Sequence, residues 1–375
     1  MELLNKQKRL WAEIDLDAID HNFDILPKPI CCVVKANAYG HGAVQLAKEY
    51  EKLKADYLAV SNIEEAIQIR NAGIKTPILI LGYTPPHCVH DLEKFNITQC
   101  LYSFEYANEL SKECSAQNKF IKCHLKIDTG MGRIGFQYHD GVNELEDAYK
   151  SSILPGIRIE GIFMHFAIAD EGQNKFTFMQ KKYFVEAIEE LESRGIVFQI
   201  KHCSNSAATL DYQDFKMDMV RAGIILYGIN PTSNKKNDLK PALSLWSVVS
   251  NVKKIRKGDS VSYGRTFIAD RDMTIATVPV GYADGFLRSN SGSNVFINGK
   301  TCPIVGRVCM DQIMVACEDA KLDDLVEVYG PHISVDYVAK YNNTIPYEIL
   351  CAIGERVPRV YKRDGKIVEI QDKLL

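Results

Sequence analysis

Short apolar runs recur along the first two thirds of the chain, separated by polar stretches whose apolar residues have helical spacing. Eight of these runs are rich in β-branched residues and predict buried parallel strands, at Ile30–Ala36, Tyr57–Ser61, Pro77–Gly82, Gln99–Ser103, Ile121–Ile127, Ile157–His165, Phe198–Ser204 and Met219–Gly228. Eight β/α units in series predict a TIM (β/α)8 barrel. A doubly wound sheet is the alternative, but eight strands in series favour closure.

Local signals predict where some helices end and where the pattern changes. Ser61 and Glu64 have the spacing of a capping box, and Gly73 stands where that helix should stop, as Gly195 does after the longer stretch from Lys175. The polar run 231–241 predicts a linker. Alternating strands follow it, with turns at 257–259, 298–299 and 364–365. We therefore expect a barrel over residues 13–235 and a mainly β domain over 236–375, with residues 1–12 packed on the latter.

Composition and charge narrow the class of protein. A chain of 375 residues is too long for one ordinary core, and 46% hydrophobic with 25% charged residues is typical of a soluble globular protein. A net charge of −3 without a basic block argues against nucleic acid and membrane partners. The 11 cysteines contain no Cys-x-x-Cys pair, and the histidines show no zinc spacing. We expect buried free thiols in the cytoplasm, no metal, and no signal peptide or membrane span.

Polar residues gather at the carboxyl ends of the predicted strands, where barrels carry their active sites. They are Lys35 after the first strand, Lys126 and Arg133 at the fifth, His165 at the sixth, His202, Asn205 and Ser206 at the seventh, and Arg221, Gly223 and Ile224 at the eighth. A buried lysine at a strand end can form a Schiff base with a carbonyl. The simpler interpretation of Lys35, a lysine that reaches solvent, leaves the other polar residues unexplained.

Two further features point to pyridoxal phosphate. Ser206 and Gly223 follow the seventh and eighth strands, where barrel loops commonly hold a phosphate, although both are also ordinary turn residues. A Schiff-base lysine and a phosphate site at one barrel end predict this cofactor. The guanidinium of Arg221 can only donate to an unprotonated pyridine nitrogen. That arrangement favours simple removal and return of a proton at Cα.

Other interpretations compete at two motifs. Gly130-x-Gly132-x-x-Gly135 formally matches a dinucleotide fingerprint, but it follows the fifth strand instead of opening the fold. His202 and Cys203 resemble a thiol–imidazole pair, yet neighbours on a strand face opposite sides. Racemisation also needs an acid/base on each face of the substrate. Tyr263 and Tyr282 lie in glycine-flanked settings that suit this role, although either could be a strand tyrosine with a satisfied hydroxyl.

Taken together, the motifs resemble those of the alanine racemase family over most of the chain. They occur in family order as Lys35–Gly42, Lys126-x-Asp-Thr-Gly-Met-Gly-Arg133, His202-x-x-Asn-Ser206, Arg221-x-Gly-Ile, Ser-Tyr263-Gly, Gly-Tyr282-Ala-Asp-Gly and Val-Cys-Met310-Asp311-Gln. The resemblance implies interconversion of L- and D-alanine by a two-base mechanism with pyridoxal phosphate, to supply D-alanine for peptidoglycan. It also implies a homodimer whose active sites are shared between subunits.

The resemblance further implies a role for each matching residue. Lys35 and Tyr263 would be the two acid/base groups, and Lys35 would carry the cofactor as a Schiff base. The cofactor would be held by Tyr39, His165, Asn205, Ser206, Arg221, Gly223 and Ile224. Arg133 and Met310 would bind the substrate carboxylate. Supporting positions would be Lys126, which matches a site carbamylated in several members, His202, Tyr282 and Asp311.

The sequence departs from the family pattern at one position and leaves several alternative functions open. Glu355 stands where well-known members place a phosphate-binding tyrosine, and its carboxylate would repel a phosphate. A pocket closed by Tyr263, Tyr282, Met310 and Ile353 favours a methyl side chain over that of serine or lysine. A barrel-type decarboxylase should have an acidic residue at Arg221. A non-enzymatic cofactor-handling protein should be a single barrel without the β domain.

Overall fold

A computed structural model describes residues 9–234 and 237–374 of the chain, which divides into two compact units. The barrel unit comprises His21–Ala38 and Ala43–Leu239, and the β unit comprises the chain up to Asp20, Tyr39–Gly42 and Lys240–Leu375. The expected boundaries, 13–235 and 236–375, differ from this division at residues 13–20, at residues 39–42, and at the end of the barrel unit, which lies at Leu239. Residues 13–20 belong to the β unit because β1 (Leu10–Asp15) pairs with strands near residues 245 and 360. Residues 39–42 belong there too.

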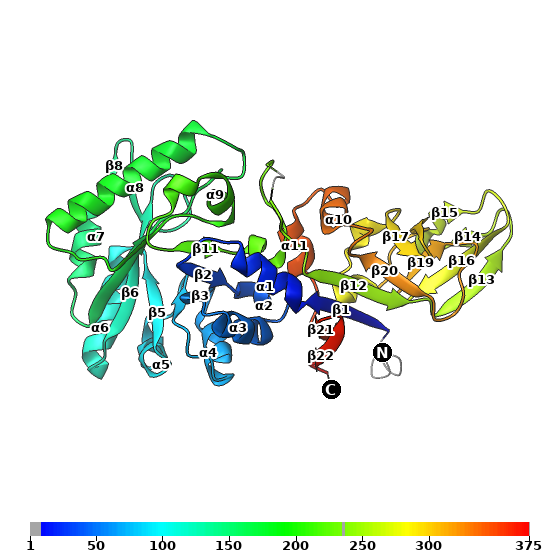
Figure 1. Cartoon of the computed structure of the whole chain (residues 1–375), viewed down its shortest axis with the longest axis horizontal. Helices are drawn as coiled ribbons and strands as arrows, with labels where there is room; N and C mark the ends of the chain where they lie inside the picture. The colour runs from blue at the N-terminus through cyan, green and yellow to red at the C-terminus, as the bar shows by residue number, and fades with distance from the viewer. Residues whose placement is uncertain (1–8, 235–236, 375) are drawn as a thin grey trace. The chain divides into compact units, whose positions relative to one another are not determined.

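Eight parallel strands form the barrel, as predicted (Figure 1). They are β2 (Ile30–Val33), β3 (Tyr57–Val60), β4 (Ile78–Ile80), β5 (Ile97–Leu101), β6 (Ile121–Asp128), β9 (Ile157–Phe163), β10 (Ile200–His202) and β11 (Val220–Ala222). From β2 to β10 each barrel strand pairs with the next one along the chain, and β11 pairs with β2. The ring is closed because the amides of Asp218 and Arg221 donate to the carbonyls of Lys201 and Ser204, each at 2.9 Å.

The barrel helices lie around these strands in Figure 1. They are α3 (Ala43–Lys52), α4 (Ile63–Asn71), α5 (Val89–Lys94), α6 (Phe104–Gln117), α7 (Leu145–Ser152), α8 (Lys175–Ser193) and α9 (Ser206–Asp211). Helix α1 (Leu16–Asp24) precedes them in the chain. A hairpin of β7 (Phe136–His139) and β8 (Val142–Asn143) lies between β6 and α7 in the sequence. The predicted capping box at Ser61 is wrong. Asn62 caps α4 instead, and its side chain accepts from the Glu65 amide. Gly73 and Gly195 follow α4 and α8 with positive φ, as predicted stops require.

Six of the eight predicted strands are shorter than the apolar runs that signalled them, and two of these six border the candidate site. The run at Ile30 ends as a strand at Val33, and the run at Met219 ends at Ala222. After Ala222 the chain passes Gly223 into a 3₁₀ turn, η3 (Ile224–Tyr227), whose four residues are all buried. Burial alone therefore does not separate strand from turn in these segments.

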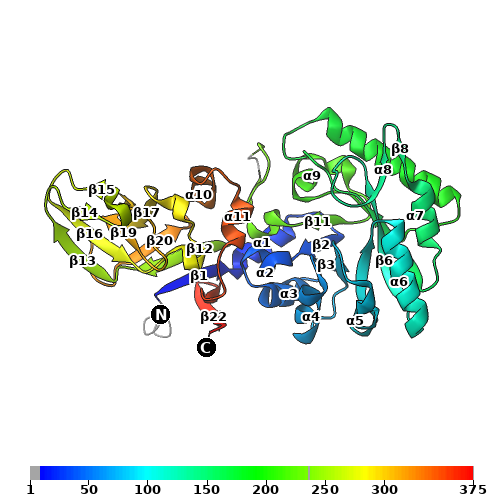
Figure 2. The ribbon, with the colours of Figure 1, turned by 180° about the vertical axis from the view of Figure 1, so that it is seen from behind.

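The β unit contains a seven-stranded sheet in the order β18-β17-β20-β12-β1-β21-β22 and a three-stranded sheet, β13-β16-β19 (Figure 2). Its strands after the barrel are β12 (Leu243–Val248), β13 (Asn251–Ile255), β14 (Ser260–Val261), β15 (Phe267–Ile268), β16 (Met273–Val278), β17 (Asn294–Ile297), β18 (Lys300–Pro303), β19 (Ile313–Ala316), β20 (Leu325–Tyr329), β21 (Arg359–Arg363) and β22 (Lys366–Gln371), with helices α10 (Val335–Tyr341) and α11 (Pro346–Cys351). The turns at 298–299 and 364–365 join hairpins, with positive φ at all four residues.

The cysteines, which all lie within the described residues, form no disulfide. All 11 cysteines are free thiols, and eight of them are buried, as Cys31, Cys100 and Cys203 illustrate. Burial raises the pKa of Cys31 and Cys100 to about 12, which makes both unreactive.

Among the described residues, no helix is long and apolar enough to cross a membrane. The same residues contain no cluster of histidine, cysteine and carboxylate groups that could hold a metal ion.

Candidate active site

Lys35 begins a turn of left-handed backbone immediately after β2. Ala36, Asn37 and Ala38 have φ near 52° and ψ near 50°, and Tyr39 continues the positive φ. This conformation costs a residue with a β-carbon about 1–2 kcal/mol. Side chains compensate: Glu65 accepts from the Ala36 amide at 2.7 Å, and Asn37 accepts from the Ala43 amide at 2.9 Å. Lys35 is thus held at the strand end by a strained, well-supported turn.

The glycine-rich loop after β6 is organised around one carboxylate. Asp128 accepts four hydrogen bonds, at 2.7–3.2 Å, from the amides of residues 130–133. Although burial alone would raise it, these donors hold the pKa of Asp128 below its usual value. The amides that a dinucleotide fingerprint would offer to a phosphate are already satisfied. The dinucleotide interpretation therefore loses its physical basis.

Arg221 lies buried at the carboxyl end of β11 and gathers the ends of neighbouring strands. Its Nη atoms donate to the carbonyls of Met164, His202 and Cys203 and to the ring nitrogens of His165 and His202, at 2.7–3.4 Å. Burial lowers the pKa of Arg221 to about 10, so the guanidinium is still charged at neutral pH. Among residues 9–234 and 237–374, no acceptor meets its Nε–H. One donor is left for an unprotonated ring nitrogen.

The other basic residues of the barrel end lie near this guanidinium. His202 stacks on Phe163 with the ring centroids 5.0 Å apart, and Lys126 Nζ lies 5.0 Å from the centroid of the same phenyl ring. Burial, followed by the charges of Arg221, Lys126, Arg133 and Lys35, lowers the pKa of His165 well below its usual value. His165 is therefore neutral at physiological pH and can stack on an aromatic ring without adding charge. The structure thus places Lys126, His165, His202 and Arg221 close together at one end of the barrel.

Lys126 is almost fully buried among these cations. Burial lowers its pKa to about 8, and the charges of Arg221 and Arg133 contribute in the same direction. An ordinary lysine amine is neutral only above about pH 10.4. The Lys126 amine becomes neutral and nucleophilic above about pH 8 instead, which makes it a chemically distinct group in the site.

The loops after β10 and β11 meet through Ser206 and Gly223. The Ser206 hydroxyl accepts from the Gly223 amide at 2.9 Å, so its own proton stays available as a donor. Asn205 caps α9 by accepting from the Ala208 amide at 3.0 Å. The side chain of Asn205, which we expect to contact the cofactor, thus also fixes the start of the helix that begins at Ser206. Ile224 opens the buried η3 turn that follows Gly223.

Within the β unit, the segment Tyr39–Gly42 is held by buried groups. Arg359 donates to the Gly40 carbonyl and Tyr361 donates to the His41 carbonyl, each at 3.0 Å. A β-carbon on Gly40 would lie 2.2 Å from the Leu350 carbonyl oxygen, so only glycine fits there. The Tyr39 ring packs 5.9 Å from that of Tyr347. No sequence motif pointed to Arg359, whose acceptors are all backbone carbonyls.

A second loop pair of the β unit carries Tyr282 and Met310. The Tyr282 amide donates to the Cys309 carbonyl at 3.1 Å, and a β-carbon on Gly281 would lie 2.3 Å from the Met310 carbonyl oxygen. Tyr282, Met310 and Tyr263 are 43%, 53% and 70% exposed in the single chain. Three large side chains that the sequence singled out are thus exposed on the β unit of the single chain.

Asp284, which follows Tyr282 in the same loop, forms ion pairs with two arginines. Its carboxylate is fully buried and accepts from Arg9 at 2.6 Å and from Arg356 at 2.7 Å. Although burial alone would raise it, these arginines hold the pKa of Asp284 below its usual value. Arg356 also pairs with Asp311, which follows Met310 in the chain. Asp284 stands in the Gly-Tyr-Ala-Asp-Gly motif but was not singled out from the sequence.

Glu355, the departure from the family pattern, pairs with Lys373. Its side chain is 73% exposed, and this pairing holds its pKa below the usual value. The carboxylate therefore already has a cation as its partner on the surface of the β unit.

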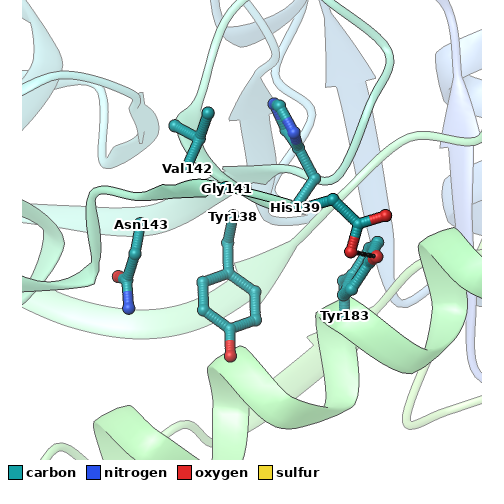
Figure 3. Close-up of a pocket in the computed structure, with 7 residues that line it drawn as sticks. Tyr138, His139, Gly141, Val142, Asn143 and Tyr183 are labelled. Atoms are coloured by element: carbon teal, nitrogen blue, oxygen red, sulfur yellow. Dashed lines mark hydrogen bonds between the residues drawn. The ribbon is translucent and has the colours of Figure 1, made fainter.

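A surface pocket on the barrel unit lies between the β7–β8 hairpin and Tyr183 of α8 (Figure 3). Residues 138–143 line it, and Tyr183 donates a hydrogen bond to Asp140. None of the residues expected in the active site borders this pocket. A concave surface alone would therefore have pointed away from the lysine and arginine chemistry described above.

The fold and the site define a class: a (β/α)8 barrel with a lysine at the end of its first strand, followed by a β unit. Comparison with known proteins makes this class specific. The family described as alanine racemase, N-terminal domain, matches residues 14–231, and the family described as alanine racemase, C-terminal domain, matches residues 242–361. The chain therefore belongs to the alanine racemase family, whose members depend on pyridoxal 5′-phosphate.

Individual members of this family are similar to the chain over nearly its whole length. Alanine racemase of Clostridium tetani is 43% identical, over 97% of this chain and 98% of that protein, and alanine racemase of Methanococcus maripaludis is 41% identical over 94% and 98%. The solved structure of alanine racemase from Clostridium difficile 630 superimposes with a TM-score of 0.93 at 41% identity, covering 98% of this chain and all of that one. The Bacillus anthracis enzyme with bound L-Ala-P gives 0.92 at 37% identity, covering 98% of each chain.

Proposed function

We propose that this chain is an alanine racemase that interconverts L- and D-alanine with Lys35 and Tyr263 as its two acid/base groups. The observation that carries the proposal is the barrel end itself. Lys35 follows β2 in a rigid turn, and Arg221 keeps one N–H donor for an unprotonated ring nitrogen. Pyridoxal phosphate, when bound, makes the Cα–H bond of an amino acid acidic enough to break. A supply of D-alanine for peptidoglycan is the role we infer.

The residues of the chain then divide the work by position. The Lys35 amine takes or returns the Cα proton on one face, and the Tyr263 phenol does so on the other. Arg221 holds the ring nitrogen without protonating it, since a guanidinium does not give up its proton at this pH. The Ser206 hydroxyl, the Gly223–Ile224 turn and Tyr39 are suited to the phosphate. Arg133 and the backbone at Met310 are suited to the substrate carboxylate.

We further propose that the enzyme is a homodimer with composite sites, in which Tyr263 and Met310 of each subunit serve the other subunit's Lys35. The exposure of Tyr263, Tyr282 and Met310 in the single chain supports this arrangement, because a partner surface would cover them. The free thiols are those of a protein kept in a reducing compartment, which supports a cytoplasmic location.

A panel of L-amino acids, followed by loss of optical activity, tests the substrate. We expect alanine to be turned over tens to hundreds of times faster than serine, since one added polar group in an apolar pocket changes the ratio by about that much. Lysine and arginine should hardly react. Comparable rates for lysine and alanine would instead favour a broad-substrate racemase.

A carbamate on Lys126 is the second testable element of the proposal. The neutral amine that carbon dioxide requires is available above about pH 8, because burial lowers the pKa of Lys126 to about 8. The product would be an anion able to orient Arg133 bidentately. In ¹³C-bicarbonate, NMR should show one carbamate resonance at roughly pH 9 that fades toward about pH 6. Lys126→Gln should abolish it, whereas Lys122→Gln on the same strand should not. Its persistence in Lys126→Gln would place the carbamate elsewhere.

A further inference from the structure

A chain of buried hydrogen bonds leads away from Arg221 through the interior of the barrel unit. Arg221 Nη1 lies 3.1 Å from His202 Nδ1, His202 Nε2 lies 2.9 Å from His124 Nδ1, and His124 Nε2 lies 3.4 Å from Glu160 Oε2. Tyr57 donates to the same carboxylate oxygen of Glu160. Both histidines are completely buried. Such a chain is expensive to bury unless every member is satisfied.

The groups at the two ends of this hydrogen-bond chain determine which atom donates and which accepts at each step. A guanidinium can only donate, so Nδ1 of His202 must accept and its proton sits on Nε2. That proton is donated to Nδ1 of His124, which places the proton of His124 on Nε2, facing Glu160. The carboxylate of Glu160 can only accept. Burial lowers the pKa of both His124 and His202, so both rings are neutral and each has a single tautomer.

The backbone of β6 and β9 leaves room for these hydrogen-bonded side chains. The pairing of β6 with β9 has an irregular register between Cys123 and His124, and His124 lies opposite Gly161. A β-carbon on Gly161 would lie 2.9 Å from the His124 ring, so glycine is needed opposite it. The hydrogen bond from His124 lowers the pKa of Glu160 to about 2, with Tyr57 contributing, and Lys122 lies 3.6 Å from its other oxygen. Glu160 is therefore a fixed negative charge.

We propose that Glu160 is a positioning residue: acting through His124 and His202, it fixes which nitrogen faces Arg221 and thereby holds the guanidinium in place for the ring nitrogen of the cofactor. The tautomers of His124 and His202 follow from the hydrogen-bonded contacts within the barrel unit, and their effect on the cofactor rests on the proposed function. Without an acceptor at position 160, the His124 proton can move to Nδ1. The Nδ1–H of His124 and the Nε2–H of His202 would then be two donors facing each other. If His202 moved its own proton to Nδ1 in response, that nitrogen would no longer accept from Arg221.

The relay can be read directly by ¹⁵N NMR of the histidine-labelled holoprotein. In the wild type, His124 and His202 should both show an unprotonated Nδ1 and a protonated Nε2. Glu160→Leu should mix or reverse these assignments in both rings, speed release of pyridoxal phosphate about tenfold and lower kcat about tenfold. Glu160→Gln keeps an acceptor, so the tautomers should persist. The His202 resonances should still shift with the lost charge, and kcat should fall less than in Glu160→Leu.

Glu327→Gln is the matched control, because Glu327 is a fully buried carboxylate paired with His332 at 2.7 Å in the β unit. It should leave the barrel histidines and cofactor release unchanged. Wild-type tautomers and wild-type release in Glu160→Leu would overturn the proposal. If that variant does not fold, unchanged His202 resonances in Glu160→Gln would do so. Failure of the proposed function would appear separately, as a wild-type protein that does not racemise alanine.

Discussion

Replacement of Lys35 by alanine is expected to abolish racemisation together with the covalent attachment of the cofactor. Loss of a positioned acid/base group alone costs about 10²–10⁴-fold in rate. Lys35 would in addition be the only lysine that forms the Schiff base, so no reducible bond should remain. Treatment of the wild type with borohydride, digestion and mass spectrometry should find the cofactor on Lys35, and optical rotation should report the rate.

A neighbouring lysine provides the control for this experiment. Lys48 lies exposed on α3, in the same barrel unit, and Lys48→Ala should retain full activity and full cofactor attachment. Cofactor fixed to another lysine in the wild type would show that the central assignment is wrong. The left-handed turn after Lys35 should survive the substitution, because its supporting bonds come from Glu65 and Asn37.

Mixed dimers of two inactive variants are expected to recover activity. Tyr263 lies on the β unit and is 70% exposed in the single chain, and we propose that it serves the partner's Lys35. Lys35→Ala and Tyr263→Phe homodimers should each be nearly inactive. In a mixed dimer, one site collects both lesions while the other has native Lys35 and native Tyr263. Co-refolding should therefore restore up to about half of the wild-type activity per mixed dimer.

Refolding each variant alone through the same procedure is the control, and neither should recover. Differently tagged subunits allow the mixed dimers to be isolated before the optical assay. If isolated mixed dimers stay inactive, Tyr263 either serves its own chain or is not the second acid/base group. The assay thus separates the identity of the residue from the way the subunits share it.

Several features of the site were predicted from the sequence only in part. The strand ends located Lys35, His165, His202 and Arg221, because parallel barrel strands place their carboxyl ends at one edge. The Gly130-x-Gly132 motif was misleading as a pattern, since it does not reveal that Asp128 already binds the loop amides. The turn after Lys35 carried no signal at all. It contains alanine and asparagine, and the hydrogen bonds that support it come from the distant Glu65 carboxylate and from Asn37.

What the sequence by itself determined is the alternation of strand and helix, the closure of the barrel and the residue types at its carboxyl end. These follow from local periodicity and from the order of elements along the chain. The tertiary structure alone decided that β1 joins the β unit, because its partners lie more than 200 residues away. It alone also decided that His124 and Glu160 stand behind Arg221. A hydrogen bond between residues on different strands depends on register and on a bulge, and neither leaves a local pattern in the sequence.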